Sequence, residues 1–233
     1  RLLEGDRIRQ QRLSRDFATR FRELEASRHP DMNWREWTEL VVELAEWEVR
    51  LGLADEPGLS EALRTLQESL RAEFARFIER HYAGWLRGSR ADRPALSVDI
   101  VPEFVEPAFR QHGKALLVVV DCLRLDQWEA IRPLISTRFD VETSYYFSIV
   151  PTATPFARNA IFSGLFPRDL AARYPRWWKD QDETSLNAHE QSLLAAQLEL
   201  RYGRVVPVRY EKVFTAADGE SLLTRLPAQL AAE

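Results

Sequence analysis

Residues 115–120 of this 233-residue chain read ALLVVV, a continuous apolar run that ends in three β-branched side chains. A run of this length and composition is typical of a strand that is buried on both faces of a parallel sheet. Helix-like and strand-like patterns alternate after it, which predicts an α/β fold. We therefore expect a doubly wound parallel sheet in which residues 115–120 form the central strand.

The segments around this strand are predicted from the same kinds of pattern. Helices are expected over residues 101–111, 125–135, 155–165, 187–202 and 220–231. Residues 139–149 are expected to form a long strand or a strand pair, and residues 204–210 a further strand. Parallel neighbours in a sheet are joined by long crossover connections, which are usually helices. The alternation of the predicted segments is consistent with such connections.

The first third of the chain has a different pattern. Residues 1–93 carry 17 Arg, no Lys and 18 Asp or Glu, and their apolar residues recur close to the helical period. Helices are expected over residues 7–25, 34–51 and 60–85. Asn33 and Glu36 form a capping-box pattern before the second helix, and Ser60 is the expected cap of the third. Three helices with short connections predict an antiparallel bundle.

A polar segment separates these two patterns. Residues 88–94 read GSRADRP, a composition typical of a linker. We therefore predict three parts: a helical bundle domain over residues 1–88, a linker with a short helix over residues 89–112, and an α/β domain over residues 113–233.

Composition excludes several classes of protein. The single cysteine, Cys122, excludes a disulfide framework and a cysteine-based zinc cluster, and it is expected to be a small buried residue. No run approaches the length of a membrane span, and the charged first residues are unlike a secretory signal. A net charge of −4 argues against general binding of duplex DNA. The prediction is a soluble cytoplasmic protein without a membrane span.

Asp121 follows the predicted central strand directly. In open α/β sheets, functional groups collect at the carboxyl ends of the strands. A carboxylate in that position is a suitable ligand for a divalent metal ion. The alternative, equally compatible with this residue alone, is that Asp121 caps the helix that follows.

A second candidate site lies in residues 151–159, PTATPFARN. Thr154 is the expected N-cap of the next helix, where free N–H groups and the helix dipole favour a phosphate. A hydroxyl there can act as a nucleophile once a metal ion removes its proton. Arg158 and Asn159, one turn along, would hold phosphoryl oxygens. On these residues alone the simpler alternative is favoured: Thr154 only caps the helix and Arg158 pairs with an acid.

The histidines give a weaker signal. His189 has several acids nearby in sequence, namely Asp180, Asp182 and Glu183. Their spacing fits no familiar ligand motif, so a metal site there is disfavoured.

Two sequence runs carry a resemblance to a known family. Residues 116–128, LLVVVDCLRLDQW, and residues 151–167, PTATPFARNAIFSGLFP, resemble the PglZ domain, a branch of the alkaline phosphatase superfamily. The second run also resembles the nucleophile region of nucleotide pyrophosphatases/phosphodiesterases. It differs at one position: the Asn that those enzymes carry three residues after the nucleophile is Ala157 here. Residues 74–86, FARFIERHYAGWL, resemble the helical middle portion of PorX-type response regulators.

This resemblance implies a fold, a cofactor and a set of site residues. It implies a partial alkaline-phosphatase-like sheet after the bundle, with two zinc ions in the complete domain. Asp121 and Thr154 would belong to the ligand set of one ion, and Thr154 would be the nucleophile. Arg158 and Asn159 would contact the substrate, a nucleotide or oligonucleotide phosphodiester. We expect the chain to be an internal piece of a longer protein, with a receiver domain before it and the remaining zinc ligands after Glu233.

Two functional hypotheses follow. The first is a zinc-dependent phosphodiesterase that serves as the output domain of a two-component response regulator, with residues 1–233 alone catalytically incomplete. The second is a non-catalytic signalling module that keeps the fold and forms a homodimer or binds a transcription or signalling partner. The first requires Asp121 and Thr154 to lie at one end of the sheet, both within about 5 Å of one metal position.

Overall fold

The computed structural model describes residues 2–178 and 187–231. It divides the chain into two compact units. The bundle unit comprises residues 1–95 and 116–147, and the second unit comprises residues 96–115 and 148–233. The chain therefore passes between the units at three points along the sequence.

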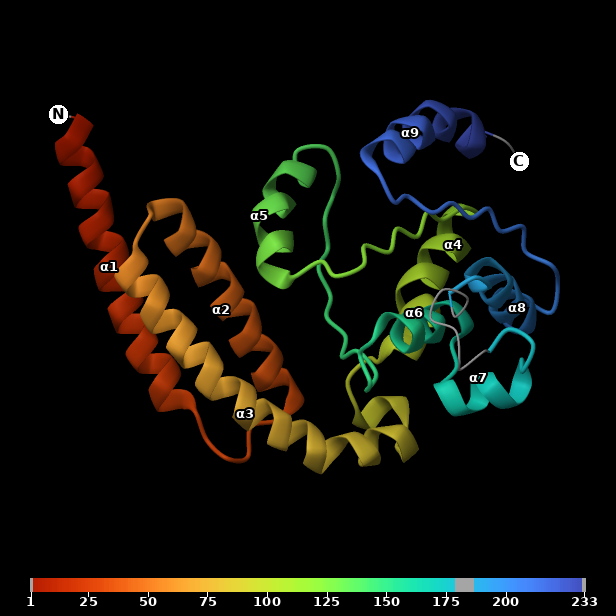
Figure 1. The fold of residues 1–233 in the computed structure, drawn as a ribbon, viewed down its shortest axis with the longest axis horizontal. Coiled ribbons are helices and arrows are strands. Elements are labelled where there is room, and N and C mark those ends of the chain that lie inside the picture. The colour runs from red at the N-terminus through yellow and green to blue at the C-terminus, as the bar shows by residue number, and fades with distance from the viewer. Residues whose placement is uncertain (1, 179–186, 232–233) are drawn as a thin grey trace. The chain divides into compact units, whose positions relative to one another are not determined.

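Three long helices dominate the bundle unit (Figure 1): α1 (Leu2–Ser27), α2 (Trp34–Ala54) and α3 (Pro57–Arg87). Neighbouring helices in the sequence run antiparallel. Phe17 of α1 packs on Trp47 near the end of α2 (5.3 Å between ring centroids), and Trp37 at the start of α2 packs on Phe74 of α3 (5.2 Å). The three helices predicted from the apolar spacing are thus present.

Of the two helix caps predicted from the sequence, one is confirmed and the other is wrong. The Asn33 side chain accepts from the amides of Arg35 (2.8 Å) and Glu36 (3.3 Å), and Glu36 accepts from the Asn33 amide (2.7 Å), so the capping box is confirmed. The Ser60 cap is wrong: Ser60 lies inside α3, and its hydroxyl donates to the carbonyl of Glu56 (2.9 Å), the N-cap residue of that helix. Pro57 explains the difference, because its fixed φ suits a first helical position and starts α3 a turn earlier.

The rest of the bundle unit contains the short helix η1 (Arg90–Asp92) and α5 (Leu125–Ile135). Helix α5 matches its predicted range and packs against α2. Its buried Glu129 accepts two hydrogen bonds from Arg132 (2.9 and 2.6 Å). In the part of the chain that the structure describes, no helix combines the length and the apolar character that a membrane crossing requires.

Residues 115–120 do not form a strand. Leu116, Val118 and Val120 are 62%, 68% and 57% exposed. The predicted strands at 139–149 and 204–210 also lack a ladder, and the described residues hold only isolated bridge pairing, with the Phe147 amide donating to the Ala95 carbonyl (2.8 Å). The predicted α/β class, with its doubly wound parallel sheet, is therefore wrong: the described fold is helical.

The physical reason lies in what an apolar run specifies. β-Branched residues favour an extended backbone locally, but a strand exists only where a second segment supplies matching N–H and C=O groups. Residues 116–147 belong to the bundle unit and residues 204–210 to the second unit, and neither supplies a ladder partner for the run. The apolar run thus predicts extended backbone and not its pairing.

The second unit is also helical. It contains η2 (Ser97–Asp99), η3 (Val101–Val105), α4 (Glu106–His112), α6 (Thr154–Ser163), α7 (Pro167–Arg173), α8 (Glu190–Tyr202) and α9 (Ala216–Ala231). Helix α6 is central, because it packs against α7, α8 and η2. At its end Gly164 has a φ of +65°, and a Cβ there would lie 2.2 Å from Nε2 of Gln197 on α8. The left-handed backbone favours glycine here, and a Cβ would also require the end of the Gln197 side chain to shift.

Candidate functional site

Thr154 is the first residue of α6 and is half-buried. The N-cap position belongs to Ala153, which has no side-chain acceptor, and Pro155 follows Thr154 in the first turn. The predicted N-cap role of Thr154 is therefore displaced by one residue. Its hydroxyl lies in the first turn of the helix, the region in which the helix dipole favours negative charge.

Arg158 lies one turn further along α6, and its Nη2 donates to Oε2 of Glu190 (2.7 Å). Its side chain is 22% exposed and that of Glu190 is 0% exposed. The simpler alternative considered for Arg158, pairing with an acid, is confirmed. The acid comes from the start of α8, 32 residues further along the chain.

Glu190 is the centre of a larger polar cluster. It accepts a hydrogen bond from the Tyr210 hydroxyl and one from Nδ2 of Asn187 (3.0 Å). Nζ of Lys212 lies 3.5 Å from Oε2 of Glu190 and donates to the Asn187 carbonyl (2.7 Å). We call these five residues the Glu190 cluster: Arg158, Asn187, Glu190, Tyr210 and Lys212.

The cluster compensates the burial of a charge in several ways. An isolated buried carboxylate is strongly disfavoured, whereas one with cationic and neutral donors is stable. Glu190 is also the first residue of α8, where the helix dipole favours an anion. Burial raises the pKa of the Tyr210 hydroxyl, and its hydrogen bond to Glu190 raises that pKa further. Tyr210 therefore stays protonated and remains a donor.

Asn159 lies on the packed face of α6 and is 1% exposed. Its Nδ2 donates to the Pro155 carbonyl (2.8 Å), one turn back in the same helix. The structure thus places this amide against the helix backbone, and its predicted contact with a phosphoryl group stays a prediction.

Asp121 is an exposed turn residue in the bundle unit. It does not cap the following helix, because the N-cap of α5 is Arg124, whose amide donates to Oε1 of Gln127 (3.0 Å). Sγ of Cys122 lies 3.8 Å from Oδ1 of Asp121. Cys122 is exposed, so the expectation of a buried cysteine is wrong.

The residues predicted to bind zinc are one carboxylate and one hydroxyl. Asp121 belongs to the bundle unit and Thr154 to the second unit. Zinc usually takes four ligands, three of them from protein in catalytic sites. Among residues 2–178 and 187–231, no group of three or more His, Cys, Asp or Glu is arranged to hold a metal ion. These residues therefore do not by themselves make the two-zinc site that the resemblance implies.

His189, the weak candidate for a metal ligand, lies beside an aromatic ring. His189 precedes α8, and its ring stacks near Trp177 (6.3 Å between centroids). The three acids that suggested a cluster, Asp180, Asp182 and Glu183, lie outside the described residues.

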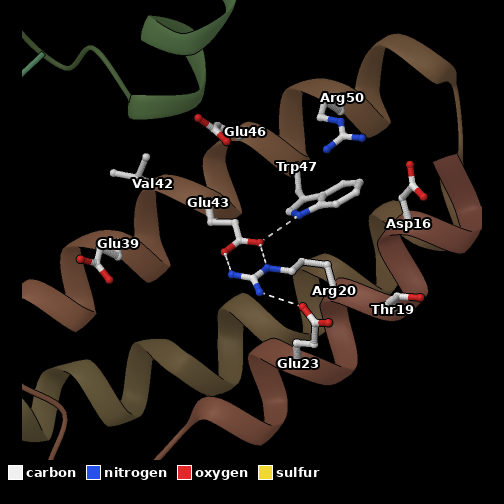
Figure 2. Close-up of a pocket in the computed structure, with 10 residues that line it drawn as sticks. All are labelled: Asp16, Thr19, Arg20, Glu23, Glu39, Val42, Glu43, Glu46, Trp47 and Arg50. Atoms are coloured by element: carbon white, nitrogen blue, oxygen red, sulfur yellow. Dashed lines mark hydrogen bonds and ion pairs between the residues drawn. The ribbon is translucent and has the colours of Figure 1, made fainter. Parts of the chain in front are cut away.

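The bundle unit has a surface hollow of about 700 Å³ between α1 and α2 (Figure 2). Its charged lining includes five acids and two arginines: Asp16, Glu23, Glu39, Glu43, Glu46, Arg20 and Arg50. Arg20 hydrogen-bonds to Glu43 and to Glu23, and the Arg50 guanidinium lies over the Trp47 ring (3.9 Å). This acidic excess makes the hollow unsuited to a phosphate.

Comparison with known families agrees with the two motifs. Residues 100–227 match the family described as the BREX system PglZ alkaline phosphatase-like domain. This match covers more than half of the chain and includes Asp121, Thr154 and the whole Glu190 cluster. The chain belongs to this alkaline phosphatase-like family.

The N-terminal part adds a second family. Residues 7–86, which contain most of α1 to α3, match the PorX response regulator linker domain. The chain therefore combines a PorX-type linker with a PglZ domain, as its sequence motifs indicated. A comparison with curated proteins finds no match to the chain.

Proposed function

We propose that this chain belongs to a phosphohydrolase that cleaves phosphodiesters of nucleotides or oligonucleotides, with Thr154 as the nucleophile. Its membership of the PglZ alkaline phosphatase-like family supports this class of reaction. The observation that carries the assignment to residues is the arrangement on α6. Thr154 begins the helix, and Arg158, four residues on, is held by a buried carboxylate.

The chemistry of these two residues is complementary. Side chains four residues apart on a helix lie on one face, with Cβ atoms about 5–6 Å apart. The Thr154 oxygen would attack phosphorus and displace the leaving group, while its proton passes to a base. The Arg158 guanidinium would stabilise the charge that develops on the phosphoryl oxygens. Asn159 would add a neutral donor after turning from the Pro155 carbonyl.

Zinc is the cofactor that we propose for the complete protein, with Asp121 and Thr154 among its ligands. Bound zinc lowers the pKa of an attached oxygen nucleophile and neutralises developing charge. The match to the PorX linker also supports a receiver domain in the same protein and a cytoplasmic signalling role. That match equally favours the second candidate function, a module that signals through association with itself or with a transcription partner.

Substitution of Thr154 by valine tests the catalytic proposal. In the complete protein, Thr154→Val keeps the shape of the side chain and removes the hydroxyl, so turnover of a chromogenic phosphodiester should fall about a hundredfold or more. Thr152→Val is a matched control, because Thr152 is exposed in the same loop and has no proposed role. Unchanged turnover in Thr154→Val would rule out the nucleophile. A protein without turnover that nevertheless self-associates would favour the signalling module.

A further inference from the structure

The bundle unit has a second surface hollow, where the loop between α1 and α2 lies beside α3 (Figure 1). Its volume of about 680 Å³ is close to that of the hollow between α1 and α2, and it lies in the range of small-molecule sites. The charge balance of the two hollows is opposite. We call this one the arginine hollow, because its charged lining, His29 aside, is three arginines and two acids: Arg28, Arg76, Arg80, Glu73 and Glu79.

The three guanidinium groups of the arginine hollow have different partners. Arg28 forms an ion pair with Glu73. The hydrogen bonds of Arg80 go instead to two carbonyls, that of Pro30 (3.1 Å from Nη2) and that of Arg76 (3.4 Å from Nε). Because a carbonyl is a neutral acceptor, these bonds fix the Arg80 guanidinium without balancing its charge.

The other two charges lie on the exposed surface of α3. The side chains of Arg76 and Glu79 form no ion pair or hydrogen bond with the residues that the structure describes. His29 lies 3.4 Å from Oε1 of Glu36, so any charge that it gains is balanced there. The arginine hollow therefore presents the positive charges of Arg76 and Arg80 against the single negative charge of Glu79. This balance favours an anionic ligand.

The lining also has an apolar part. It is formed by Pro30 of the loop and by Trp37 of α2, which is 4% exposed. The Trp37 ring is held by the rings of Phe74 (5.2 Å between centroids) and Phe77 (5.9 Å) of α3. A phosphate ion alone would leave most of the hollow to water. A larger ligand could place a phosphate on the arginines and an organic part on this apolar wall.

We propose that the arginine hollow binds a small organic phosphate, with the phosphate oxygens on Arg76 and Arg80 and the organic part against Pro30 and Trp37. Residues four apart on a helix lie on one face, and a planar guanidinium can engage two phosphate oxygens. All four residues lie in the part of the chain that matches the PorX linker domain. The inference therefore does not rest on the role proposed for Thr154.

Binding of AMP to the full chain tests this site. It is measured by isothermal titration calorimetry in the presence of EDTA, so that only side chains contribute. Arg76→Gln and Arg80→Gln should each weaken binding about fivefold, because each removes a cationic contact to the phosphate. Arg20→Gln and Arg50→Gln, in the hollow between α1 and α2, are matched controls and should change it less than about twofold. No saturable binding below about 10 mM AMP, or equal losses in the controls, would overturn the site.

The Glu79→Gln variant tests the sign of the charge balance. Removal of this acid should tighten AMP binding about twofold, which a merely structural role of the arginines would not produce. Unchanged or weaker binding in Glu79→Gln would contradict the proposal. If Arg80→Gln loosens the loop at Pro30, Arg76→Gln still decides the matter, because the Arg76 side chain holds no other residue in the described part of the chain.

Two further ligands define the chemical class. Adenosine should not bind measurably, and inorganic phosphate should bind at least about threefold more weakly than AMP, because it cannot contact the apolar wall. Adenosine binding as tight as that of AMP would exclude the phosphate contact, and equal binding of phosphate and AMP would exclude the organic part. Loss of AMP binding in Arg158→Gln, with normal binding in Arg76→Gln, would place the ligand on α6 and overturn the proposal.

Discussion

Two charge clusters of opposite design occur in this molecule, one in each unit. In the bundle unit, Arg20 is a cation shared by the carboxylates of Glu43 and Glu23, and its side chain is 46% exposed (Figure 2). In the second unit, the carboxylate of Glu190 is shared by Arg158 and Lys212 and is fully buried. Arg20 makes three hydrogen bonds to its two acids, whereas Glu190 accepts one from Arg158 (2.7 Å) and lies 3.5 Å from Nζ of Lys212. A further difference is the surrounding water, which screens the first cluster and is excluded from the carboxylate of the second.

This difference determines what each cluster can do. An exposed ion pair contributes about 0–1 kcal/mol to stability, because water competes for both partners. In a buried cluster, removal of either the carboxylate or a cationic donor leaves the remaining charge without its partner, which lowers stability strongly. The second cluster is therefore the better candidate for a structural role.

The largest expected effect is the loss of the buried carboxylate. Glu190→Ala should lower the free energy of unfolding by about 2–4 kcal/mol, since it leaves Arg158 and Lys212 together without the anion between them. Urea denaturation at neutral pH measures the change. Glu43→Ala, which removes the main partner of Arg20, should cost less than about 1 kcal/mol. Equal losses in the two variants would contradict the distinction between the clusters.

Lowering the pH should remove the stability contributed by a second buried carboxylate, that of Glu106. Burial opposes ionisation of Glu106, but hydrogen bonds from Arg201 and Arg110 outweigh it and lower the pKa of this carboxyl below its ordinary 4.5. A lowered pKa contributes stability that is present above the ordinary value and is lost as pH falls through the folded value. The melting temperature of the wild type should therefore fall more steeply below pH 4.5 than that of Glu106→Gln. Parallel curves for the two proteins would contradict this coupling.

Local interactions in the bundle provide a smaller effect. Asn33→Ala removes the acceptor of two amides at the start of α2 and should destabilise the protein by about 1 kcal/mol. Ser60→Ala is the matched control, because the Ser60 hydroxyl bonds back to the carbonyl of Glu56, the N-cap residue of α3. Denaturation midpoints of the two variants measure the difference. A larger loss in Ser60→Ala would restore it as a cap.

The comparison of the units also shows what could be predicted from sequence. The bundle helices and the Asn33 capping box depend on residues within one or two turns, so spacing and composition were sufficient. The sheet depended on pairing between distant segments. The apolar pattern of residues 115–120 contains no information about such a partner, and the central strand was therefore predicted wrongly.

The same limit applies to the candidate site. Thr154 and Arg158 were predicted together because a helix start places them within a few residues of each other. Pairing of Arg158 with an acid was foreseen, but the surplus of acids gave no means of choosing Glu190 among them. Lys212 lies further along still, two residues after the end of the segment predicted as a strand. Nothing in the local pattern marks either residue as part of the cluster.

The smallest expected effect on stability is that of a substitution at Arg20, in the exposed cluster. Arg20→Gln removes the cation between Glu43 and Glu23, yet these side chains are 22% and 54% exposed and regain water. The free energy of unfolding should change by less than about 1 kcal/mol. The change should also disappear in about 1 M salt, where the Debye length is only about 3 Å. The effect of Glu190→Ala should persist at that salt concentration, because ions do not reach the buried carboxylate. A large, salt-resistant effect of Arg20→Gln would show that the exposed cluster is as strongly coupled as the buried one.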